Sequence, residues 1–175
     1  IAQIIDIVIF SVISREKYDE IIYEILGTRA KKRAMFLLER MDRTEHQLRE
    51  KLMQNGYPDV CVDLAVEYVR KYHYIDDLRY ATTYISYQQK KNSRQKLKMD
   101  LIAKGIEKSV IEQALDEVFD SDEQLKIRQL LEKKHYEPKE CDRKEQQKIY
   151  QYLMRRGFKS SDILHVMKIW DEYEE

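Results

Sequence analysis

The side chains that most often act in catalysis or hold metal ions are few in this sequence, and they stand apart from one another. The sequence has four histidines: His46, His73, His135 and His165. They form no HExxH pair, and no cysteine stands at metal-ligand spacing from any of them. Cys61 and Cys141 are also far apart along the chain, and we expect both to be reduced thiols. The sequence therefore predicts no metal site.

Phosphate-binding loops and paired acid and base groups are equally hard to find. No two of the four glycines are close together, so there is neither a GxGxxG loop nor a Walker-type loop for a nucleotide. Asp76 and Asp77 could be an acid and base pair, but they directly precede an apolar-periodic stretch, where a carboxylate caps free helix amides. Capping is the favoured interpretation. We expect no enzyme activity and no cofactor.

Basic side chains form the one recurrent pattern that could bind a ligand, an acidic protein surface or a phosphate backbone. The candidate contacts are Arg29, Lys31, Lys32 and Arg33; Lys90, Lys91, Arg94, Lys96 and Lys98; and Arg155, Arg156 and Lys159. Tyr84 and Tyr87 adjoin the second cluster and could stack on bases, although tyrosines at this spacing are more often core or rim residues.

The composition indicates that helices must position these side chains. Of 175 residues, 37% are charged and 43% are hydrophobic, with 13 tyrosines, so the chain should fold. Only four glycines and two prolines are available for the turns that β-hairpins need, which favours helices. The apolar start, "IAQIIDIVIFSVIS", is too short to span a bilayer and predicts a strand or a buried edge. We expect a cytoplasmic protein with no membrane segment.

One local pattern occurs three times, as "LMQNGY", "LIAKGI" and "LMRRGF". In each copy, apolar residues stand eight and four positions before a glycine, and another apolar residue follows it. The repeat-defining residues are Leu48, Leu52 and Gly56; Leu97, Leu101 and Gly105; and Ile149, Leu153 and Gly157. Such spacing lines one face of a helix that ends at the glycine, and the next residue can fold back on that face. A spacing of about 50 residues between glycines is typical of helical repeat proteins.

Start signals place a helix on each side of the glycine and a third before each pair. Thr44, Ser93 and Asp142 are predicted N-caps of the middle helices. Asp59, a capping box from Ser109 to Glu112, and Ser160 or Ser161 are predicted to begin the last helices. The first helices are expected near 29–41, 76–91 and 122–135. The predicted fold is all-α: elongated tandem three-helix repeats with one continuous core, after a short strand-like or irregular N-terminal segment.

The predicted organisation is an N-terminal segment at 1–28, strand-like and then helical, followed by repeats at 29–75, 76–121 and 122–175. Net charge is zero, but basic stretches coincide with the helices before each glycine and acidic stretches with those after it. This banding could be solvated surface with weak ion pairs, or it could serve binding. Neither alternative is excluded by the sequence.

A helix-turn-helix that reads DNA bases is a further alternative, because each glycine turn joins two helices. Its second helix would have to lie in a DNA groove, close to the phosphates of both strands. Here that helix carries several carboxylates in every copy: Asp59, Asp63 and Glu67; Glu112, Asp116 and Glu117; and Asp162, Asp171 and Glu172. Sequence-specific reading is therefore disfavoured, and non-specific contact through the basic helices remains open.

Four blocks together resemble the RecX family of bacterial regulators. They are "RAKKRAMFLLERMDRTEHQLREKLMQNGY", "YIDDLRYATTYI", "SRQKLKMDLIAKGIEKSVIEQAL" and "LMRRGFKSSDI", in this order over about residues 29–170. Asp77, Tyr80, Ala81 and Tyr84 match the family's acidic-aromatic-alanine block, and Lys104, Gly105 and Ile106 its central stop. The family often has glycine where this chain has "KNSR", and residues 1–28 match only loosely.

The resemblance implies tandem three-helix repeats and a regulatory role. It implies a protein that binds the RecA recombinase filament, restrains recombination and the coprotease activity, and so modulates DNA repair and the SOS response. We expect the protein to be a monomer. The resemblance also implies contact with single- or double-stranded DNA, and neither an enzyme activity nor a cofactor. Non-specific DNA binding alone, or a helical scaffold for another protein, are the alternatives.

Overall fold

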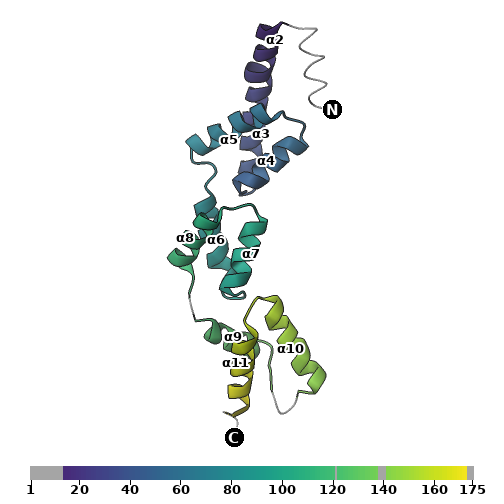
Figure 1. Ribbon diagram of the computed structural model, residues 1–175, viewed down its shortest axis with the longest axis vertical. Helices are drawn as coiled ribbons and strands as arrows, with labels where there is room; N and C mark the ends of the chain where they lie inside the picture. The colour runs from purple at the N-terminus through teal and green to yellow at the C-terminus, as the bar shows by residue number, and fades with distance from the viewer. Residues whose placement is uncertain (1–13, 121, 138–140, 173–175) are drawn as a thin grey trace. The chain divides into compact units, whose positions relative to one another are not determined.

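The computed structural model describes residues 14–120, 122–137 and 141–172, and side chains as far as Lys168. It divides into two compact units, residues 1–77 and 78–175 (Figure 1). The strand predicted for the N-terminal segment falls on residues 1–13, which are not among the described residues. From Ser14 onward the segment is helical: α2 (Arg15–Asp19), capped by Ser14, continues into the π-helix η1 (Glu20–Leu26) and then into α3.

The described residues are helical, as predicted, and follow the three-helix order. In the first unit α3 (Gly27–Arg40), α4 (Glu45–Gln54) and α5 (Asp59–Lys71) surround one core, with α3 packed mainly on α5. Helix α6 (Asp77–Gln88) begins at the last residue of that unit and leads into α7 (Arg94–Ala103) and α8 (Lys108–Val118). The third group is α9 (Glu123–Glu132), α10 (Arg143–Arg155) and α11 (Ser160–Glu172). The unit boundaries after residues 28, 75 and 121 stay predictions.

The glycine stops are confirmed as three copies of one helix end. Gly56, Gly105 and Gly157 have φ of 84°, 80° and 81°, in the left-handed region that favours glycine. Each glycine N–H donates to the carbonyl three residues back at 2.9 Å. The following N–H donates five residues back, for example from Tyr57 to Leu52 at 3.3 Å. These are the two hydrogen bonds of a Schellman motif.

The apolar positions of the repeat fill the cores. Leu48, Leu52, Leu97, Leu101 and Leu153 are fully buried, and Ile149 is half-buried. Ile106 and Phe158, which follow two of the glycines, are also buried, while Tyr57 is half-buried. The continuous core was a wrong expectation: the buried hydrophobic residues of the described chain form three clusters, one for each group of three helices. Within the second unit, polar residues such as Ser93, Glu123 and Arg156 make the junction between groups.

Most predicted helix starts are confirmed. Thr44 forms a complete capping box with Gln47, and the side chains of Ser93 and Asp142 accept the predicted hydrogen bonds. The box from Ser109 to Glu112 was wrong, because Glu107 occupies the N-cap and α8 begins at Lys108. Pro58 is likewise the N-cap of α5, two residues after its glycine. The glycine turn therefore sets where the next helix begins, whatever side chain stands there.

Two carboxylates cap helices other than their own. The Asp77 Oδ1, expected to cap the helix it precedes, accepts the Glu45 N–H at the start of α4, at 2.9 Å. In the second unit Glu123 Oε1 accepts the Arg94 N–H at the start of α7, at 2.7 Å. Asp77 and Glu123 are the first residues of α6 and α9. In both places a free amide and the helix dipole at a helix start favour a carboxylate. Within the second unit, Glu123 thus ties the beginning of α9 to the middle helix of the preceding group.

Replacing two of the stop glycines by alanine should give unequal losses of stability. Gly56→Ala should lower the free energy of unfolding by about 1–2 kcal/mol, because Ala is strained at positive φ. Backbone strain is the whole cost there, since a Cβ at Gly56 meets nothing within 4 Å. At Gly157 a Cβ would also lie 2.6 Å from Ser93 Oγ and 2.8 Å from Lys96 Cβ. Gly157→Ala should therefore cost at least ~1 kcal/mol more. Urea unfolding of both variants measures the difference, and equal losses would contradict the close approach.

Removal of the Glu123 carboxylate should loosen the start of α7. Glu123→Ala should lower stability by about 1 kcal/mol, whereas Glu123→Gln, which keeps a carbonyl acceptor, should lose less than half of that. Amide hydrogen exchange at Arg94 should accelerate in the alanine variant only. Glu132→Ala, at an exposed position later in α9, is the matched control. Equal exchange rates at Arg94 in all variants would refute the cross-group cap.

Candidate partner-binding surfaces

The residues that could have formed a metal or catalytic site remain apart in the described part of the chain. No group of three His, Cys, Asp or Glu residues could hold a metal ion there. His73 and His135 lie at positive φ next to helix ends, and His46 and His165 are exposed. The buried Cys61 thiol donates to the Ile22 carbonyl at 3.4 Å, and burial raises its pKa, which disfavours the reactive thiolate. Within the same residues, no helix is long and apolar enough to cross a membrane.

The second basic cluster is largely neutralised by the neighbouring acidic helix. The Arg94 guanidinium binds Glu112 at 3.0 Å and Asp116 at 2.8 Å, and Lys98 also binds Glu112. The hydrogen bond to Asp116 is the main cause of a raised Arg94 pKa. Hydrogen bonds from Lys98 and Arg94 lower the pKa of Glu112. Both helices thus stay charged and paired at neutral pH.

Lys96 is paired as well, within its own helix. Its ammonium binds Asp100 at 2.5 Å, and the Tyr84 hydroxyl donates to the same carboxylate at 3.2 Å. Burial and the Asp100 charge raise the pKa of Tyr84 to about 12. Tyr84 packs against the second core, while Tyr87 is exposed. Of the five basic residues predicted here, Lys90 and Lys91 are exposed and have no ion pair with a described carboxylate.

The same register produces a cross-helix ion pair in the first unit. Arg49 binds Asp63 at 2.6 Å, as Lys98 binds Glu112, and both pairs join the residue seven before the stop glycine to the residue seven after it. Arg49 also binds Glu45, which in turn binds Arg70. Burial alone would raise the pKa of Glu45, but the hydrogen bonds from Arg70 and Arg49 outweigh burial and lower that pKa.

The third group replaces this ion pair with uncharged side chains. Tyr150 and Leu164 stand at the equivalent positions seven before and seven after Gly157. The Tyr150 hydroxyl donates to Ser160 Oγ instead, and Leu164 is exposed. Charge pairing across the glycine turn is therefore a feature of the first two groups.

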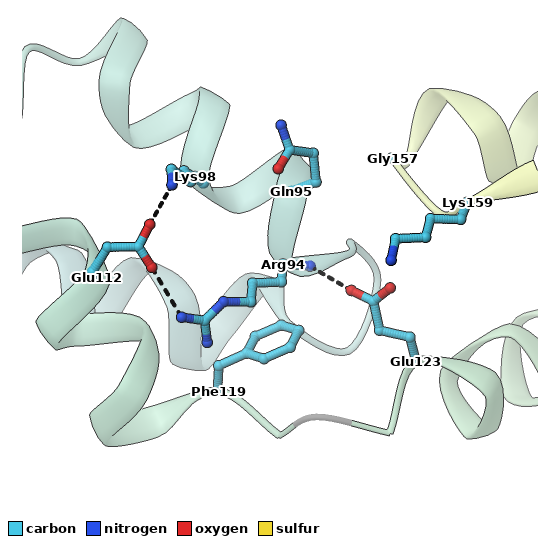
Figure 2. A pocket seen from close by; sticks show the side chains of 8 residues that line it. All are labelled: Arg94, Gln95, Lys98, Glu112, Phe119, Glu123, Gly157 and Lys159. Carbon is cyan, nitrogen blue, oxygen red and sulfur yellow. Dashed lines mark hydrogen bonds and ion pairs between the residues drawn. The ribbon is translucent and has the colours of Figure 1, made fainter. Parts of the chain in front are cut away.

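A shallow cleft of about 450 Å³ lies between α7, α8 and the α10–α11 turn (Figure 2). Figure 2 shows Arg94 and Lys98 converging on Glu112, the Phe119 ring beside the Arg94 guanidinium, and Lys159 extending toward Glu123. Because carboxylates bind Arg94 and Lys98, this part of the cleft is an internal charge network rather than a free anion site. Lys126 is buried at 5% exposure, 3.7 Å from the Phe119 ring centroid.

In the third basic cluster, two residues are exposed and one makes structural contacts. Arg155 is exposed, and Lys159 is exposed at the rim of the cleft. Arg156 instead donates from Nη1 to the Lys91 carbonyl at 2.9 Å and stacks on Tyr152, with 4.5 Å to the ring centroid. It holds the two groups of the second unit together.

The first basic cluster, on α3, is the least neutralised. Lys31, Lys32 and Arg33 pair with no carboxylate of the described chain, and Arg33 donates instead to the Asn55 amide oxygen at 3.0 Å. Arg29 is exposed on the same helix. Phe36 and Arg40 also belong to this surface, although neither was among the predicted contacts. The spacing of Arg33, Phe36 and Arg40 over two helical turns was the signal that could have found them.

Three-helix groups in tandem, with charged faces and no catalytic cluster among the described residues, define the class: an α-helical repeat protein whose surfaces are suited to binding. Sequence models of the first, second and third three-helix domains of RecX match residues 30–68, 76–115 and 121–167. The chain belongs to the RecX family of regulatory proteins.

Individual relatives agree with this assignment. The regulatory protein RecX of Clostridium acetobutylicum is 32% identical over 162 residues, which cover 90% of this chain and 76% of that one. The RecX of Vibrio parahaemolyticus is 32% identical over 145 residues, which cover 82% of this chain and 92% of that one.

Solved RecX structures share the fold. A crystal structure of regulatory protein RecX matches with a TM-score of 0.73 at 24% identity, covering 89% of this chain and 80% of that one. The crystal structure of RecX from Lactobacillus salivarius matches with a TM-score of 0.68 at 23% identity, covering 83% and 97%.

The buried Lys126 should make the free energy of unfolding depend on pH in the alkaline range. Burial lowers its pKa in the folded state, so the unfolded state binds a proton more readily. The free energy of unfolding should therefore rise as pH increases between the lowered pKa and the ordinary lysine value. Lys126→Met should raise stability at pH 7 by on the order of 1 kcal/mol and abolish that rise. Denaturant unfolding at several pH values measures the stability at pH 7 and its rise with pH, and the exposed Lys133→Met is the control. If the free energy of unfolding depends on pH in the same way for the wild type and Lys126→Met, the prediction is wrong.

Proposed function

We propose that this protein binds the RecA recombinase filament on DNA and inhibits its recombination and coprotease activities, thereby modulating DNA repair and the SOS response. The observation that carries the proposal is the tandem arrangement of three RecX-type three-helix domains in one chain. The relatives named above are regulatory proteins, which agrees with action through binding. In this proposal the protein acts as a cytoplasmic monomer, without a cofactor and without catalysing a reaction.

Inhibition by binding would need surfaces that meet both the recombinase and the DNA. The exposed basic residues of α3, together with Lys90, Lys91, Arg155 and Lys159, support such contacts because their charges are available. Arg94, Lys96 and Lys98 support them less, because carboxylates of α7 and α8 already bind them. The acidic faces of α5 and α8 oppose insertion of these helices into a DNA groove, so non-specific contact through basic residues is the DNA role that remains.

A binding experiment separates this proposal from its two alternatives. Immobilised protein is presented with the cognate RecA, with single-stranded DNA, or with both, at two salt concentrations. A filament regulator retains RecA and slows strand exchange. A DNA-binding module alone retains DNA with a steep salt dependence and ignores RecA. A scaffold for another protein retains neither, and that result would refute the proposal.

The exposed pair Lys90 and Lys91 gives a variant that leaves the internal ion pairs intact. Lys90→Ala/Lys91→Ala should weaken inhibition of strand exchange several-fold at 0.1 M salt, because two charges that attract phosphates or acidic protein surface are lost. Its helicity and unfolding midpoint should match those of the wild type. Lys108→Ala, an exposed lysine on the acidic helix α8, should inhibit normally. Unchanged inhibition by the double variant would remove this basic segment from the mechanism.

A further inference from the structure

The α3 surface differs from the other basic faces because its positive charge is not balanced within the molecule. In α7, carboxylates bind Arg94, Lys96 and Lys98. On α3, four cations, Lys31, Lys32, Arg33 and Arg40, lie within ten residues of one another and form no ion pair with any described carboxylate. Crowded like charges are mutually repulsive, so this face would gain from an acidic partner.

Lys31 and Lys32 line a groove with an apolar floor, and Arg33 and Arg40 lie next to it at the Phe36 ring. A groove of about 400 Å³ is lined by Thr28, Lys31, Lys32, Met35, Phe36 and Glu39 of α3 and by Tyr68 of α5. Met35 and Tyr68 form part of the floor, because both pack against the first core. Phe36 is 41% exposed, so part of its ring is open to solvent. Aromatic residues, Met and Arg are enriched in protein interfaces, whose rims are polar, so Met35 and Phe36 within a charged rim suit a protein-binding groove.

The aromatic rings hold the cations of this surface in place. The Arg33 and Arg40 guanidinium carbons lie 5.3 and 4.4 Å from the Phe36 ring centroid, and the Lys31 ammonium lies 5.7 Å from that of Tyr68. A guanidinium stacked on a ring keeps its N–H edge available, and that edge fits a carboxylate with two parallel hydrogen bonds. Arg33 Nε already donates to Asn55, so Arg40 has the freer edge for a carboxylate. Since the side chains are already positioned, less rotamer entropy is lost when an anion binds.

The floor of the groove favours a peptide over a nucleic acid. Met35 and Phe36 offer apolar surface to a side chain such as leucine or phenylalanine, which a sugar-phosphate backbone lacks. Glu39 lines the same groove and repels a carboxylate as well as a phosphate, so the apolar floor is the feature that distinguishes the two kinds of partner. Phe36 and Tyr68 already carry cations close to their rings, which leaves less ring surface for base stacking.

We propose that this groove of α3 and α5 is a docking site for an acidic protein segment that carries an apolar anchor side chain, and that the recombinase presents this segment. The apolar side chain rests on Met35, Phe36 and Tyr68. Its flanking carboxylates meet the lysine rim and the two arginines on Phe36. The identity of the partner rests on the proposed function.

Two double variants of equal charge change test the docking site. Lys32→Glu/Phe36→Ala removes the anchor surface and reverses one rim charge. Lys51→Glu/Met53→Ala makes the same kind of change on α4 of the same unit, where Met53 is also exposed. RecA binding without DNA is measured by biolayer interferometry, and binding of a labelled single-stranded oligonucleotide by anisotropy. Helicity and unfolding midpoints check both proteins, and Lys32→Glu alone, at an exposed position, serves if the double variant unfolds.

The α3 variant should bind RecA at least tenfold more weakly, with oligonucleotide binding reduced less than threefold, while the α4 variant should match the wild type in both. With p-benzoylphenylalanine in place of Phe36, photo-crosslinking should capture RecA peptides with more Asp and Glu than Lys and Arg. If the α3 variant binds RecA as tightly as the wild-type protein does, the docking site is refuted while the proposed function stays intact. A selective loss of oligonucleotide binding would make the groove a nucleic-acid site instead. If the wild type binds no RecA, the proposed function itself fails.

Discussion

The left-handed glycine at the end of each middle helix is the constraint on which the other contacts depend. At positive φ the chain can satisfy the last helix carbonyls and turn back within two residues, so the next helix begins at a fixed offset. That offset decides which side chains face one another. Leu52 meets the residue after the glycine, and Arg49 meets Asp63. Without this turn, neither the core nor the cross-helix charge pairs would keep their register.

The junction between the two groups of the second unit follows a different rule, since it is polar. The Glu123 carboxylate, at the first residue of α9, accepts a hydrogen bond from a free amide at the start of α7, and within the first unit Asp77 does the same for the Glu45 amide. In the second unit, Arg156 and the close approach of Gly157 to Ser93 add to the junction. A hydrogen bond of this kind is directional but contributes only about 1 kcal/mol. Within the second unit, each group can therefore keep its own core while a few specific contacts position the other group.

Local signals made most of the fold predictable from the sequence. Helix stops depend on a glycine and its neighbours, and N-caps such as Thr44 depend on residues three apart, so both are visible in short windows. Pairing across space was less accessible. The sequence showed that Asp77 caps a helix but not that it caps α4, 32 positions earlier in the chain. Phe36 was not among the predicted contacts, because its 41% exposure depends on how the helices pack rather than on its sequence neighbours.

The two kinds of basic face have different energetic consequences for binding. A partner that binds Arg94 or Lys98 must first compete with Glu112 and Asp116, so part of the new interaction only replaces an old one. On α3 no such exchange is needed, because Lys32 and Arg40 face solvent without a described carboxylate. Equal numbers of positive charges therefore give unequal affinities for an anion. Counting lysines and arginines along the sequence overestimates the binding surface on α7 and underestimates that on α3, where Phe36 concentrates the unpaired charge.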